Sequence, residues 1–110
     1  MAQYEYIKLY WQHDPDYSTS TDPVVMFYEV DTQRDRFAVR MTNIFADRTA
    51  FPVINDEAEF VTDDPVPTVE EFNIELPPEF KDRFFAELIS KEEFEEVYNS
   101  KEYSGKLTAD

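Results

Sequence analysis

The chain of 110 residues contains no cysteine, one glycine and one histidine. Without cysteine there is no disulfide bond and no thiolate nucleophile. A single glycine excludes the glycine-rich loops that hold phosphate groups, and no G-x-S-x-G nucleophile motif occurs. A single histidine leaves too few ligands for a typical zinc or iron site. These absences argue against an enzyme, and we expect no cofactor and no metal.

Long apolar runs and targeting signals are also missing. No stretch approaches the roughly 20 apolar residues that a membrane-spanning helix needs. Residues 1–5 carry neither the basic nor the apolar region of a signal peptide. We therefore expect a cytoplasmic protein with no membrane contact.

Basic residues are scarce, and their shortage is uneven along the chain. Ten lysines and arginines stand against 25 aspartates and glutamates, for a net charge of −15. Residues 1–50 hold eight acids and five bases, whereas residues 51–110 hold seventeen acids and five bases. Such a surface disfavours direct binding of nucleic acid, which is itself densely negative. It would attract a basic protein partner, mainly through the second half of the chain.

Aromatic residues are abundant, at 16% of the chain, and rings of this size can build a core in a small protein. We expect a single domain over residues 1–103, followed by a C-terminal tail at 104–110 that frays. Alternating apolar and polar residues predict a first strand within residues 4–14. Further strands are predicted at 24–30, 36–46 and 49–54, the last confined to a sheet edge by Pro52.

Two helix starts are visible near the C-terminus. Thr68 and Glu71 have the spacing of a capping box, and so do Ser90 and Glu93. Residues 80–89 fit either a helix or a strand, and the second capping box favours a strand because it should open a new helix. The fold class is therefore α+β. We expect an antiparallel β-meander of about four to five strands, with two short C-terminal helices packed on one face.

Several short motifs resemble those of a bacterial family known as a domain of unknown function, DUF6881. They are Trp11-Gln12-His13-Asp14, Tyr28-Glu29-Val30-Asp31, Phe37-Ala38-Val39-Arg40, residues 65–73 from Pro65-Val66-Pro67-Thr68 onward, and residues 89–98 from Ile89-Ser90-Lys91-Glu92 onward. The resemblance covers most of residues 4–98. It departs from the family at Asp47-Arg48, where the family has an Asp-Gly turn. Small acidic domains of this kind resemble the immunity proteins of bacterial toxin systems, which neutralise a toxin domain by binding it.

Trp11, His13 and Asp14 gather the two rarest side chains of the chain. They permit two interpretations: a ligand or metal contact, or a structural role in which Trp11 is core and His13 forms a hydrogen bond with Arg40 or Glu29. The shortage of ligands favours the structural role. For Glu29 and Arg40 we expect a cross-strand ion pair or a bridge to a helix end, and the alternative is that they form part of a ligand-binding face.

The acidic second half carries the functional hypothesis, an immunity or antitoxin protein that occludes the basic cleft of a toxin, such as a nuclease. We expect a monomer or weak homodimer. One alternative is a phage or mobile-element inhibitor that mimics DNA, and another is a small ligand-binding domain or enzyme centred on His13. The candidate partner-binding carboxylates are Asp56, Glu57, Glu59, Asp63, Asp64, Glu70, Glu71, Glu92, Glu93, Glu95 and Glu96.

Overall fold

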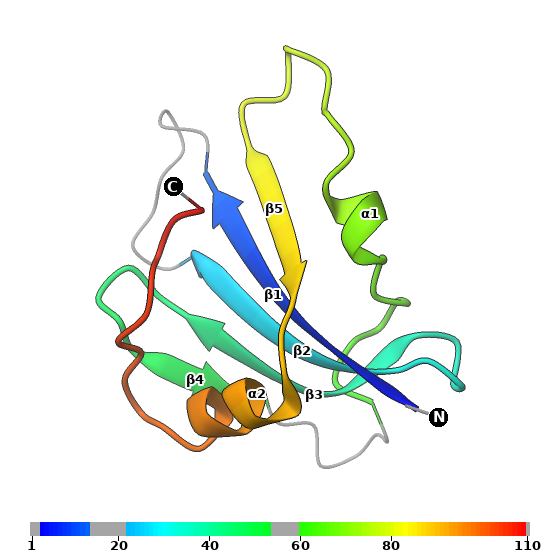
Figure 1. The fold of residues 1–110 in the computed structure, drawn as a ribbon. Helices are drawn as coiled ribbons and strands as arrows, with labels where there is room; N and C mark the ends of the chain where they lie inside the picture. The colour runs from blue at the N-terminus through cyan, green and yellow to red at the C-terminus, as the bar shows by residue number, and fades with distance from the viewer. Residues whose placement is uncertain (1–2, 14–21, 54–59, 110) are drawn as a thin grey trace.

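Five antiparallel strands form one sheet in the computed structural model, which describes residues 3–13, 22–53 and 60–109 (Figure 1). The strands are β1 (Tyr4–Gln12), β2 (Val25–Asp31), β3 (Phe37–Ile44), β4 (Ala50–Pro52) and β5 (Arg83–Leu88). Two short helices, α1 (Val69–Phe72) and α2 (Lys91–Tyr98), complete the described elements. The protein is thus an α+β domain.

The strand order is β4-β3-β2-β1-β5, so only the first four strands form a meander. Residues 83–88 are a strand, which settles the ambiguity over residues 80–89. This strand does not continue the meander beyond β4. It crosses to the opposite edge and pairs with β1, from Ile7 opposite Leu88 to Gln12 opposite Arg83. The first strand is therefore enclosed by neighbours on both sides.

A β-bulge separates the two ends of β3. Glu29 lies opposite Arg40, but Val30 lies opposite Ala38, so Val39 is an extra residue on β3. Simple alternation along the strand would put Ala38 and Arg40 on the same face. The bulge reverses this, because each extra residue shifts the alternation by one position. Ala38 packs in one core, and Arg40 points to the other face of the sheet.

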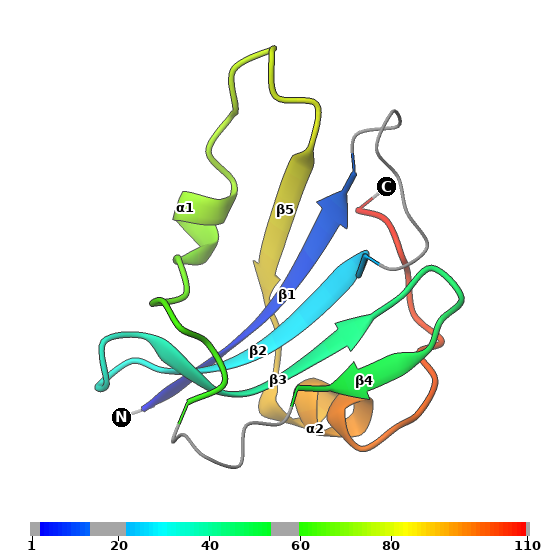
Figure 2. The same ribbon diagram turned by 180° about the vertical axis from the view of Figure 1, so that it is seen from behind.

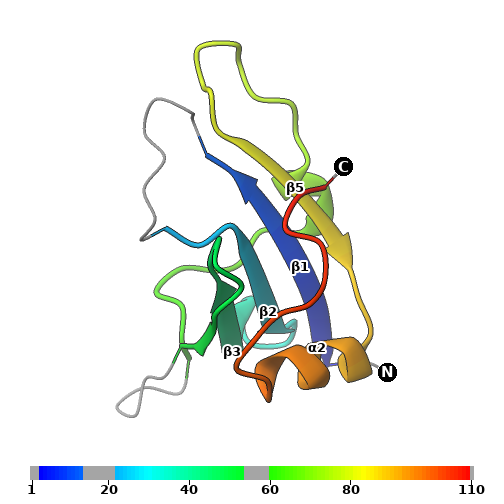
Figure 3. The same ribbon diagram turned by 90° about the vertical axis from the view of Figure 1, so that its left-hand side faces the viewer.

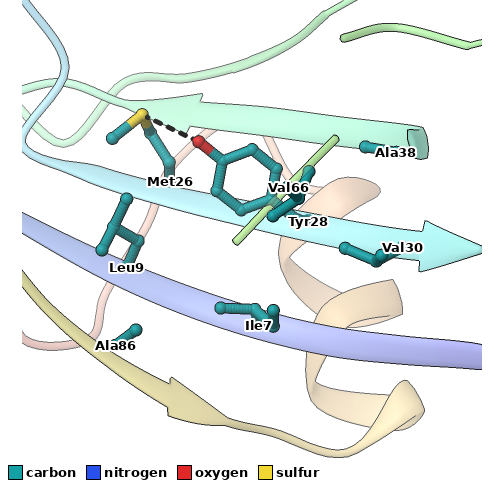
Figure 4. Packing of buried hydrophobic residues seen from close by; sticks show 8 residues of the cluster. All are labelled: Ile7, Leu9, Met26, Tyr28, Val30, Ala38, Val66 and Ala86. Atoms are coloured by element: carbon teal, nitrogen blue, oxygen red, sulfur yellow. Dashed lines mark hydrogen bonds between the residues drawn. The ribbon is translucent and has the colours of Figure 1, made fainter. Parts of the chain in front are cut away.

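The two helices lie on opposite faces of the sheet, which corrects the expectation that both pack on one face. Val69 and Phe72 of α1 pack on the α1-side core (Figure 4), which consists of Ile7, Leu9, Met26, Tyr28, Val30, Ala38, Val66 and Ala86. Phe94 of α2 belongs to the α2-side core, with Tyr10, Val25, Phe27, Ile44, Ala50 and Tyr103. The α2 helix crosses in front of the sheet in Figure 1 and behind it in Figure 2.

The reason for this two-sided arrangement lies in β2. All seven of its residues are buried, and they point alternately to the two faces. A strand that is apolar on both sides needs cover on both sides. One helix supplies part of the cover on each face, and the segments beside it supply the rest.

Both predicted helix starts are confirmed as N-caps. Thr68 and Glu71 form a reciprocal capping box, and the Ser90 hydroxyl accepts from the backbone N–H of Glu93. The helix that follows Thr68 is only four residues long, so its position depends on packing and on this cap. The ring of Phe72 stacks on Tyr28 at 6.3 Å between centroids.

The outer edge of β5 is bonded to a side chain. The Asn73 amide donates to the carbonyl of Ala86 at 2.9 Å, and its oxygen accepts from the Ala86 N–H at 2.7 Å. One side chain thus reproduces the pair of hydrogen bonds that a neighbouring strand would make. At the other edge of the sheet, Pro52 ends β4, where the sequence placed it.

The C-terminal segment runs along the α2 side of the sheet after the helix ends (Figure 3). The backbone N–H of Ala50 donates to the carbonyl of Lys101, and the guanidinium of Arg48 donates to the carbonyls of Tyr103 and Gly105. Leu107 packs against the α2-side core. Gly105 and Leu107, in the segment expected to fray, thus contact the rest of the domain.

Candidate functional site

The expected pairing of Glu29 with Arg40 is present and is bidentate. Arg40 Nε and Nη2 lie 2.6 Å and 2.8 Å from the two Glu29 carboxylate oxygens. Arg40 Nη2 also donates to Glu95 on α2 at 2.5 Å, and the hydroxyl of Tyr6 donates to Glu29 at 2.7 Å. The expected cross-strand ion pair is thus combined with a bridge to the middle of α2 rather than to a helix end.

Electrostatic interactions and ring contacts let this network attach α2 to the sheet, and we call it the tether. Burial would raise the pKa of Glu29, but hydrogen bonds from Arg40 and Tyr6 outweigh it and lower that pKa. The guanidinium also lies 5.1 Å from the ring centres of Phe94 and Tyr98. Arg40 therefore holds α2 to the sheet through charge and through stacking, and Glu95 forms an ion pair within the molecule.

His13 directly follows β1 and contacts Pro23 in the segment just before β2. Its Nε2 is 2.7 Å from the carbonyl oxygen of Pro23, and a carbonyl can only accept, so Nε2 carries the proton. The His13 ring is 3.9 Å from the ring of Trp11, whose Nε1 donates to Asp82. The expected hydrogen bond of His13 is present, but its partner is Pro23 and not Arg40 or Glu29. Asp14 lies outside the described residues.

Among residues 3–13, 22–53 and 60–109, no three His, Asp or Glu side chains gather in a way that could hold a metal ion. Within the same ranges, no helix is long and apolar enough to cross a membrane.

The predicted acidic residues do not form one face. Glu70 and Glu71 are on α1, and the four glutamates of residues 92–96 are on α2, across the sheet. The carboxylate of Glu71 is engaged in the capping box. Asp63 and Asp64 are exposed in the segment that leads to α1. Asp56, Glu57 and Glu59 lie outside the described residues.

Part of the acidic set does converge, on a surface hollow of about 260 Å³ that we call the acidic hollow. Its lining residues are Lys8, Glu93, Glu96, Val97, Ser100, Glu102, Tyr103, Ser104 and Gly105. Three of them are exposed glutamates. Sequence reasoning missed Glu102, because it follows the helix in a segment without periodic pattern. The backbone bridge between Thr49 and Glu102 brings it beside α2.

Lys8 lies under this hollow and is only 6% exposed. Its ammonium is 4.7 Å from the ring centre of Tyr10 and 5.3 Å from that of Tyr103. Burial would lower the pKa of Lys8, but hydrogen bonding to the Tyr10 and Tyr103 hydroxyls outweighs it and raises that pKa. Lys8 is therefore held as a cation, and with three carboxylates the hollow keeps two net negative charges.

The fold and these sites define a small acidic α+β domain, a five-stranded antiparallel sheet with one short helix on each face. Comparison with protein-family models places residues 5–103 in the domain of unknown function DUF6881. The chain belongs to the DUF6881 family. Neither the curated proteins nor the solved structures provide a match to this chain.

Proposed function

We propose that this protein is a cytoplasmic immunity or antitoxin protein that binds the basic cleft of a bacterial toxin domain. The observation that carries the proposal is the acidic hollow, where Glu93, Glu96 and Glu102 surround one opening. Carboxylates grouped in this way suit a lysine or arginine side chain, because an arginine binds carboxylates through paired, charge-assisted hydrogen bonds.

The composition of the hollow supports a specific contact rather than general solubility. Tyr103 and Val97 add an aromatic ring and an apolar side chain beside the carboxylates. Strong contacts in protein interfaces combine a charged group with an aromatic or apolar surface that excludes water. A basic side chain entering the hollow would find both.

Inhibition would follow from occlusion. A toxin that acts on nucleic acid holds phosphate groups with lysine and arginine side chains. Pairing those side chains with Glu93 and Glu96 would deny them to the substrate. The net charge of −15 would speed the encounter and make it sensitive to salt. The carboxylates of α1 face away from this contact, so they would add long-range attraction only.

The test uses the product of the gene adjacent to this one, measured for binding by calorimetry and for growth inhibition with and without this protein. The charge variant combines Glu93→Gln, Glu96→Gln and Glu102→Gln. The matched control removes three charges elsewhere, with Asp63→Asn, Asp64→Asn and Glu70→Gln. We expect the charge variant to weaken binding at least tenfold more than the control, since each lost charge pair contributes about 1 kcal/mol or more.

Two results would contradict the proposal. One is a neighbouring product that neither inhibits growth nor binds this protein. The other is equal binding by the charge variant and its control, which would mean that total charge rather than the hollow governs association. Thermal unfolding of both variants verifies that the substitutions leave the fold intact.

A further inference from the structure

A second hollow lies away from the acidic one, at the end of β1 and the start of β5. This cavity has a volume of about 360 Å³, and we call it the aromatic cavity. Tyr10 and Phe85 form one wall, with ring centres 6.2 Å apart, and Leu107 of the C-terminal segment forms another. Its size falls within the usual range for small-molecule pockets, about 300–1,000 Å³.

The charge of the lining is opposite to that of the protein. The described residues around this cavity include one cation, Arg83, and no aspartate or glutamate. The chain as a whole has 25 acidic residues in 110. A lining whose described residues hold one cation and no carboxylate, in so acidic a protein, favours a ligand that carries negative charge.

Phe85 packs against the ring of Tyr10 on one side, and because its other side faces the open cavity it is 45% exposed. A large aromatic side chain left in water loses the free energy that burial would provide, about 25 cal/mol for each Å². An apolar ligand in the cavity would cover this ring. The apolar wall therefore suits the body of a ligand, and the cation suits its charged end.

Arg83 is arranged to bind such an end. Its Nη1 donates to the backbone carbonyls of Phe80 and Asp82. Nε and Nη2 have no partner within the described ranges of the chain, and these two donors are parallel. A carboxylate can accept from both at once. Gln12, directly opposite Arg83 in the sheet, lines the same cavity and adds an amide.

We propose that the aromatic cavity binds a small apolar carboxylate, with its chain or ring against Tyr10, Phe85 and Leu107 and its carboxylate on Arg83. The proposal is independent of the proposed toxin partner, because none of these residues lines the acidic hollow.

Octanoate is the probe, and 1-octanol is the matched uncharged compound of equal chain length. Equilibrium dialysis measures the binding of each compound, and the variants described next locate it in the cavity. We expect saturable binding of octanoate. Affinity for 1-octanol should be about tenfold or more lower, because a charge-assisted pair contributes about 1.5–3 kcal/mol.

Arg83→Gln should reduce octanoate affinity about tenfold or more while leaving that for 1-octanol unchanged. Lys106→Gln, which removes an exposed cation outside the lining, is the control and should bind octanoate as the unmodified protein does. A second variant, Leu107→Trp, fills the cavity and keeps Arg83. It should abolish binding of both compounds, provided that thermal unfolding shows a folded protein.

Absence of binding up to the solubility limit of octanoate would overturn the proposal. So would equal affinity for octanoate and 1-octanol, or unchanged binding by folded Arg83→Gln. Unchanged binding by folded Leu107→Trp would place the probe elsewhere and would overturn it as well.

Discussion

Replacing Arg40 with methionine tests the tether between α2 and the sheet most directly. Methionine keeps a long side chain that can still contact the rings of Phe94 and Tyr98, but it removes the charge and all the hydrogen bonds. The Glu29 side chain is 8% exposed, so its carboxylate would be left inside the protein with the Tyr6 hydroxyl as its described partner.

The expected cost follows from that unpaired carboxylate. Hydrogen bonds to charged groups contribute about 1.5–3 kcal/mol each, and removing one partner of a fully buried ion pair costs about 3–5 kcal/mol. Because the side chain of Arg40 is 29% exposed, water can replace part of the contact. We therefore expect Arg40→Met to lower the free energy of unfolding by about 2–4 kcal/mol, which corresponds to a melting temperature lower by roughly 10–20 °C in a domain of this size.

Urea unfolding of Arg40→Met, Glu29→Gln and the double variant provides the assay. The double variant should lose about 1–3 kcal/mol less than the sum of the single variants, because each single change removes the same interaction. Lys101→Met, which removes an exposed cation, is the control and should change stability by about 0.5 kcal/mol or less. A loss under about 1 kcal/mol for Arg40→Met, or additive single effects, would refute a tether role for this network.

Three further predictions concern pH and packing. The fold lowers the pKa of Glu29 from its ordinary value of 4.5, so the ionised carboxylate stabilises the protein above pH 4.5 and this stabilisation is lost as the pH falls below that value. The stability of Glu29→Gln, measured by circular dichroism, should therefore depend less on pH in the acid range. Burial raises the pKa of Tyr28 from 10 to about 12, and burial together with the Glu29 contact raises the pKa of Tyr6 to about 12 as well. The stability that these neutral tyrosines provide should therefore be full below pH 10 and fall toward pH 12. Titration by absorbance at alkaline pH should show one late-titrating tyrosine fewer in Tyr28→Phe, and identical titration curves would contradict this. A methyl group at Gly105 would overlap the buried hydroxyl of Tyr103. Gly105→Ala should therefore lower the free energy of unfolding in urea by about 1–3 kcal/mol. An unchanged free energy of unfolding would mean that this segment can shift to make room for the methyl group.

Local patterns in the sequence predicted the local structure well. The alternating residues of β1 and β2, the Thr68 and Ser90 caps and the ion pair of Glu29 with Arg40 are all encoded by neighbours in the chain or across one hairpin. Each depends on short-range spacing, where period and capping chemistry are most informative.

Long-range pairing was not predictable in the same way. The return of β5 to β1 joins residues more than seventy positions apart, and no local signal selects that partner over β4. The bulge at Val39 changes which face each side chain meets, so a period-of-two pattern misassigns Ala38. Glu102 joins the acidic hollow only because the chain turns back after α2, and Arg83 reaches the aromatic cavity only through that same long-range strand pairing.

The Asn73 amide that bonds to the edge of β5 has a consequence for the behaviour of the protein in crowded solution. A sheet with an open edge can recruit a strand from another molecule, and such recruitment leads to aggregation or amyloid growth. Phe85 and Leu88, 45% and 61% exposed, would make this edge attractive to another apolar strand. Asn73 occupies both hydrogen-bonding groups of Ala86 at the middle of the edge, so an incoming strand must displace it first. A single amide thus occupies the backbone groups at the centre of the edge that an incoming strand would need.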